Sequence, residues 1–114
     1  MDIRTKRVYE PPSPDDGKRV FVERLWPRGM KKEELKIDYW DKEVAPSTEL
    51  RKWFSHDPAK WEEFKKRYWD ELKGNPRVEE LREWGRRGTL TLLFSAKDKD
   101  RNSAIALKEY LERG

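Results

Sequence analysis

Residues 89–96 read TLTLLFSA, and this stretch decides the fold class of the chain. Its nearly continuous apolar run predicts a strand that is covered on both faces, as strands of a parallel sheet are. Parallel strands cannot be joined by tight hairpins, because each connection has to return to the end of the sheet at which the previous strand began, usually through a helix. The segments on either side of residues 89–96 are therefore expected to be largely helical.

Three helices are predicted before this strand and one after it. Asp57 and Asn75 each precede a proline, and such a pair favours a helix start, because the side chain accepts a free N–H group and proline fits the first turn. Ser47 or Thr48 can cap the first helix in the same way. Apolar residues at spacings of three and four predict helices over residues 47–54, 59–73, 76–87 and 103–113.

The first 46 residues are less regular. Strands are predicted at residues 3–9 and 20–23, separated by a loop with three prolines and a glycine at 11–17. Residues 31–35 predict one short helical turn, and residues 37–40 fit either type of structure. The whole order predicts one α/β domain over residues 1–114. It would be a small two- or three-layer sandwich with a three- to four-stranded, at least partly parallel sheet and four to five helices.

The amino-acid composition argues against several kinds of functional site and against a membrane protein. The sequence has no cysteine and one histidine, which argues against a disulfide framework, a thiolate nucleophile and a zinc site, and no cofactor is predicted. No apolar stretch approaches the roughly 18 residues of a membrane span, and no signal-peptide pattern begins the chain, so a cytoplasmic protein without membrane partners is expected. Charged residues make up 44% of the chain, as in the ion-pair-rich surfaces of thermophile proteins.

The positive charge is concentrated in residues 18–36. Seven basic residues stand there against three acidic ones, which accounts for the whole net charge of +4. Such a local excess can steer an anionic partner toward the protein. It can equally belong to a solvated basic loop.

A candidate anion site lies in this basic segment, where residues 24–29 read RLWPRG. Arg24 and Arg28 offer planar forks of donors for a carboxylate or phosphate, and Trp26 between them offers an apolar wall. In parallel sheets, ligands bind beyond the carboxyl ends of the strands, where these residues are expected.

A second loop, at residues 95–103, follows the strand at 89–96. Ser95, Lys97, Asn102 and Ser103 could add donors there, and the helix that begins after this loop offers free N–H groups to an anion. The prediction is a crevice between the two loops that binds a small anionic ligand. The competing interpretation is a structural ion pair between Arg24 or Arg28 and Asp98 or Asp100.

His56 and Asp98 are the candidate acid–base groups if the protein is an enzyme. The ordinary pKa of histidine suits proton transfer near neutral pH. A single histidine beside a helix cap is more often a local hydrogen-bonding group, so whether there is a reaction stays open. Two other functions also stay open: a nucleic-acid-binding or regulatory module that uses residues 18–36, and an interaction protein with an exposed tryptophan patch. The first would bind with a steep dependence on salt.

Several motifs together resemble the YeaO-like branch of the DUF488 family, over nearly the whole chain. They read KRVY at 6–9, DDG at 15–17, RLWPRG at 24–29, APS at 45–47, LRKWF at 50–54 and HDP at 56–58. The resemblance implies a small single-domain α/β protein of unknown function, and it implies no reaction. Other members of the family carry a Cys-His-Arg motif after the strand that corresponds to residues 89–96. Here residues 100–103 read DRNS, with neither cysteine nor histidine.

Overall fold

All four strands of the protein run parallel in one sheet. The computed structural model describes residues 1–113, and the order across the sheet is first, fourth, second, third strand. The α/β fold predicted from residues 89–96 is confirmed. The elements in chain order are β1 (Asp2–Arg7), β2 (Lys18–Phe21), α1 (Lys32–Leu35), β3 (Tyr39–Trp40), α2 (Thr48–Phe54), α3 (Trp61–Leu72), α4 (Pro76–Arg87), β4 (Thr89–Phe94) and α5 (Ser103–Arg113).

Strand β4 is central, because it pairs with β1 on one side and with β2 on the other. Leu90 and Leu92 point to the helical face of the sheet and Leu93 points to the opposite face, and all three are fully buried. Burial on both faces is what the unbroken apolar run of this strand predicts.

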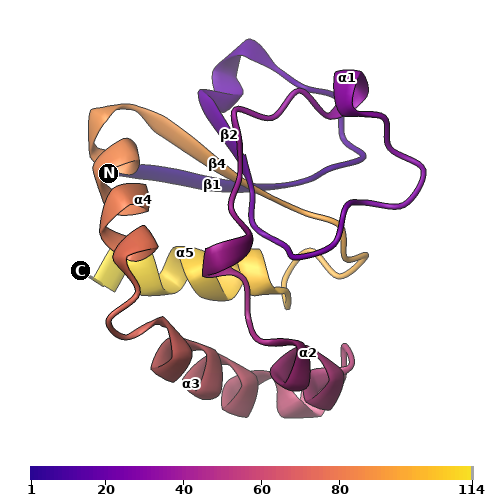
Figure 1. Cartoon of the computed structure of the whole chain (residues 1–114), viewed down its shortest axis with the longest axis vertical. Helices are drawn as coiled ribbons and strands as arrows, with labels where there is room; N and C mark the ends of the chain where they lie inside the picture. The colour runs from indigo at the N-terminus through magenta and orange to yellow at the C-terminus, as the bar shows by residue number, and fades with distance from the viewer. Residues whose placement is uncertain (114) are drawn as a thin grey trace.

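Two different kinds of structure cover the two faces of the sheet. Helices α4 and α5 pack directly on one face, and α3 lies against α5 with α2 beside it (Figure 1). The other face is covered by an irregular segment that includes α1, through Trp26, Met30, Leu35 and Ile37. The result is three layers, of which only one is a full helical layer.

The predicted helix starts are confirmed by their caps. Ser47, Asp57 and Asn75 each accept a hydrogen bond from a backbone N–H two or three residues later. Asp57 begins a single 3-10 turn at Pro58–Lys60, and α3 continues from Trp61.

Strand β2 begins two residues earlier than its apolar pattern indicates. The reason is Arg19, which is only 5% exposed although it is a charged residue within a strand. Its guanidinium pairs with Asp16 and donates to the carbonyls of Leu35 and Lys36. A basic residue therefore points into the protein here and holds the segment before β3.

Gly17 lies where the chain turns into β2 beside the start of β4. Its φ is +62°, and a Cβ built on it would lie 2.3 Å from the carbonyl oxygen of Thr89. Both facts require a residue without a side chain at this position.

The described part of the chain has no helix with the length and apolar composition needed to cross a membrane. All six tryptophans are buried or half-buried. The exposed large apolar residues are instead Met1, Tyr9, Leu25 and Tyr39.

Candidate functional site

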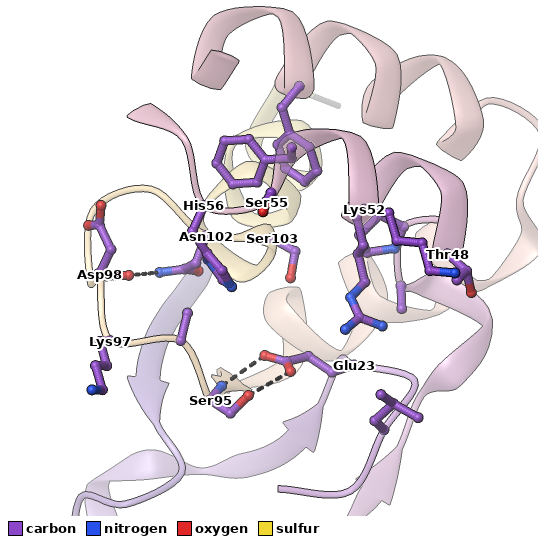
Figure 2. A pocket seen from close by; sticks show the side chains of 17 residues that line it. Glu23, Thr48, Lys52, Ser55, His56, Ser95, Lys97, Asp98, Asn102 and Ser103 are labelled. Atoms are coloured by element: carbon purple, nitrogen blue, oxygen red, sulfur yellow. Dashed lines mark hydrogen bonds between the residues drawn. The ribbon is translucent and has the colours of Figure 1, made fainter. Parts of the chain in front are cut away.

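A cavity of about 860 Å³ opens beyond the carboxyl ends of β2 and β4 (Figure 2). Its volume is in the range of pockets that hold small molecules. Glu23 and Leu25 line it from the segment after β2, and residues 95–98 line it from the segment after β4. Helix α2 and the two residues after it form the third wall. Of the two predicted loops, residues 95–103 contribute six residues to this lining, whereas residues 24–29 contribute only Leu25.

Glu23 joins the two loops. Its carboxylate accepts hydrogen bonds from the backbone N–H and the hydroxyl of Ser95, both at 2.8 Å (Figure 2). From the other side, Arg7 donates to the carbonyls of Ser95 and Ala96. The beginning of the loop after β4 is thus held by side chains from β1 and from the end of β2, which fixes its backbone before any ligand binds.

The rest of this loop is organised by its own side chains. Asp98 accepts from the backbone N–H groups of Asp100 and Arg101, and these hydrogen bonds lower the pKa of its carboxyl. Asn102 donates to the carbonyl of Asp98 and accepts from the N–H of Ile105, so it caps α5. Asp98 is therefore an ionised turn-forming residue at neutral pH, which suits proton transfer poorly.

The start of α5 reaches the cavity at Ser103 and has free N–H donors. Among the described residues, the backbone N–H groups of Ser103 and Ala104 have no acceptor, because the first helical bond runs from Ala106 to the carbonyl of Asn102. The side chain of Ser103 lines the cavity. Free N–H groups at a helix start attract negative charge.

Three cationic side chains surround the same space. Arg51 and Lys52 come from α2, and Lys97 comes from the loop after β4. Within residues 1–113, none of the three makes an ion pair or a side-chain hydrogen bond, although most other arginines of the chain do. Their charges are therefore available to a ligand.

His56 lies on the wall of the cavity in an unusual backbone conformation. Ser55 and His56 have φ of +45° and +55°, so two successive residues with side chains are left-handed. This conformation is costly for residues other than glycine, and such residues concentrate at functional sites. The chain reverses here between α2 and the turn that begins α3, which brings both side chains to the cavity.

Six of the nine candidate residues line the cavity, and three do not. The six are His56, Ser95, Lys97, Asp98, Asn102 and Ser103. Arg24 instead donates to the carbonyls of Ala45 and Pro46. Trp26 packs against Phe21 and Trp40 on the opposite face of the sheet, and its indole N–H donates to the carbonyl of Met30. Arg28 is exposed outside the cavity.

The proposed ion pair between the two loops is not present among the described residues. Asp98 pairs with Arg101 of its own loop, and Arg24 bonds to carbonyls. A structural connection between the loops does exist, but Glu23 makes it through Ser95. No group of three or more potential metal ligands occurs within residues 1–113.

Arg51, Lys52 and Glu23 were not identified from the sequence as site residues. Arg51 and Lys52 lie on the polar side of a short helix in a chain with 27 basic residues, so local pattern does not distinguish them. The one available signal was their position in the sequence, because this helix ends two residues before the only histidine of the sequence.

The segment before α2 carries this wall of the cavity and is held by side chains from three other parts of the chain. Arg24 donates to the backbone carbonyls of Ala45 and Pro46, and the side chain of Asn75 donates to the backbone carbonyl of Glu43. Tyr68 is fully buried, which raises the pKa of its phenol, and its hydroxyl donates to the carbonyl of Val44.

Tyr68→Phe should lower the free energy of unfolding by about 1–2 kcal/mol, because the buried carbonyl of Val44 then loses its donor. Urea unfolding followed by tryptophan fluorescence would measure this. The matched control is Tyr110→Phe, since Tyr110 is half-buried and its hydroxyl makes no hydrogen bond within the described residues. Equal effects of the two substitutions would show that the bond to Val44 does not hold the segment.

Comparison with known proteins places the chain among uncharacterised relatives. It is 44% identical over 112 residues to the uncharacterised protein YeaO of Escherichia coli (strain K12), with 97% of each chain covered. It is 40% identical over 109 residues to the uncharacterised protein Rv3073c of Mycobacterium tuberculosis (strain H37Rv), covering 96% of this chain and 92% of that one. No solved structure matches significantly. Residues 2–114 match the family model described as the inactive DUF488-N3 subclade, and the chain therefore belongs to this subclade of the DUF488 family.

Proposed function

We propose that this protein binds a small anionic ligand, phosphorylated, carboxylated or a nucleotide, in the cavity between residues 24–29 and 95–103. One observation carries the proposal: Arg51, Lys52 and Lys97 surround one cavity without a partner among the described residues. The free N–H groups at the start of α5 add to the attraction for negative charge.

The role proposed is binding without catalysis, in the cytoplasm. The chain belongs to a subclade that is described as inactive, and no Cys-His-Arg motif follows β4. Of the two candidate acid–base groups, Asp98 already accepts hydrogen bonds from the backbone of the turn before α5. His56 lines the cavity and serves as a ligand contact in this proposal.

Arg51→Gln should weaken binding of the anion by about tenfold or more, because a hydrogen bond to a charged group is worth about 1.5–3 kcal/mol. The measurement is isothermal titration with inorganic phosphate, a nucleoside monophosphate and an aryl carboxylate. Lys66→Gln is the control, since Lys66 is exposed on α3 and does not line the cavity. The proposal fails if both variants bind as the wild type does, or if none of these anions binds to the wild type.

A nucleic-acid-binding module that uses residues 18–36 is the alternative. It has less support, because three basic residues of that segment have internal contacts. Arg19 and Arg24 bind backbone carbonyls, and Lys18 lies over the ring of Trp84. Binding to a labelled oligonucleotide that falls steeply with salt and is lost in Lys31→Gln/Lys32→Gln would favour the alternative.

A further inference from the structure

The cavity has an apolar side as well as a cationic one. Phe54 and Phe64 belong to its lining, with their rings stacked at a centroid distance of 4.4 Å and an interplanar angle of 24°, but they are only 5% and 1% exposed and lie mostly in the core. Ala45, Pro46 and Ala96 extend this surface. A ligand made only of charged groups would leave the accessible part of this apolar lining, including Ala96, facing water, so the lining fits a ligand that has an apolar part.

Leu25 adds an apolar group at the rim. It is 65% exposed, more than any other large apolar residue of the described chain. It also belongs to the cavity lining, so its exposure coincides with the site. Covering this side chain would contribute to the free energy of binding in proportion to the apolar area removed from water.

The charge of the lining limits the charge of the ligand. Arg51, Lys52 and Lys97 carry three positive charges, and Glu23 and Asp98 carry two negative ones. Both carboxylates are held in place by hydrogen bonds from backbone N–H groups. The balance is one positive charge, which matches a monoanion. A polyphosphate would bring several negative charges close to two fixed carboxylates, and like charges at short range repel.

We propose that the ligand is an aromatic monocarboxylate, an inference that rests on the proposed function. The guanidinium of Arg51 is the group best suited to a carboxylate, because its planar fork can donate two parallel hydrogen bonds. The aromatic body would lie under Leu25 and against Ala96 and the small accessible part of Phe54. A contact with the ring of Phe54 would favour an aromatic body over an aliphatic one of equal area.

Four probes separate the parts of this proposal. Phenylacetate has the charge and the ring, acetate has only the charge, phenylacetamide has only the ring, and adenosine monophosphate has a dianionic phosphate. Isothermal titration gives the affinities, and amide chemical shifts of residues 95–104 locate the binding. Phenylacetate should bind at least about tenfold more tightly than each of the other three.

Leu25→Ser is the matched variant for the apolar contact. Leu25 is exposed, so the substitution should leave the unfolding midpoint unchanged. It should weaken phenylacetate binding several-fold and leave acetate binding unchanged. Arg51→Gln should weaken both carboxylates together.

The possible results distinguish this inference from the proposed function. If adenosine monophosphate binds as tightly as phenylacetate or more tightly, or acetate binds equally well, and Arg51→Gln weakens that binding, the anion site stands and the aromatic monocarboxylate is overturned. If phenylacetamide binds as well as phenylacetate, charge is not recognised and both fail. Both also fail if no probe shifts the amides of residues 95–104.

Discussion

Gly17→Ala should destabilise the protein by at least about 3 kcal/mol, or prevent folding. Two costs combine at this position. The backbone has φ +62° and ψ −132°, which residues with a side chain rarely adopt, and the added Cβ would lie 2.3 Å from the carbonyl oxygen of Thr89. Because Thr89 begins the central strand, relief of the contact would move β4 away from the turn before β2. Urea unfolding would measure the loss.

Gly74→Ala separates the two costs. Gly74 has φ +77°, and a Cβ built there would have no atom within 4 Å, so only the backbone cost remains. We expect a loss of about 1 kcal/mol for this substitution. Similar losses in the two variants would contradict the close contact between the turn and β4.

Arg19→Met should cost about 3–5 kcal/mol, because it removes one member of a buried ion pair. Asp16 would keep only Lys6 as a cationic partner, and the carbonyls of Leu35 and Lys36 would lose their donors. The control is Arg4→Met, since the Arg4–Asp2 pair is about half exposed on both sides and such pairs contribute roughly 0–1 kcal/mol. Equal losses in Arg19→Met and Arg4→Met would show that burial of the Arg19–Asp16 pair does not increase its contribution to the free energy of unfolding.

The effect of Arg19→Met should depend on pH. Burial acts to raise the pKa of Asp16, but hydrogen bonds from Ser13, Lys6 and Arg19 outweigh it and hold the pKa below its usual 3.8. A depressed carboxyl pKa stabilises the folded state above the unfolded pKa, and this contribution is lost as the pH falls through the folded value. The difference in stability between wild type and Arg19→Met should therefore shrink at acid pH, which unfolding curves between pH 7 and pH 3 would show.

Much of the fold could be predicted because its signals are local. The apolar run at 89–96 and the capped starts at Asp57 and Asn75 each lie within a few residues, and all three are confirmed. The predicted strand at 20–23 lies two residues too late, because Arg19 is part of β2 and is buried. Its hydrogen-bond partners lie up to 17 residues away in the sequence. A pattern of apolar residues cannot show that an arginine will be satisfied inside the protein.

The candidate site was predicted only in part, because only some of its signals are local. Residues 95–103 follow directly from the end of a strand, and several of them line the cavity. Trp26 and Arg24 have residue types that suit ligand binding, but their contacts with Met30 and with Ala45 lie within the protein. Arg51 lies on the cavity because side chains distant in the sequence, Arg24 and Tyr68, hold the segment before α2, and no local pattern around Arg51 indicates these contacts.

The central place of β4 also bears on how the protein is made. Strands β1 and β2 do not pair with each other, because β4 lies between them and pairs with both, while β2 also pairs with β3 on its other side. During synthesis on the ribosome, the N-terminal strands must wait until residues 89–94 have emerged before either can join that partner. Until then β1 has no strand partner and β2 has only the two-residue pairing with β3, so the native sheet assembles only after β4 has been made.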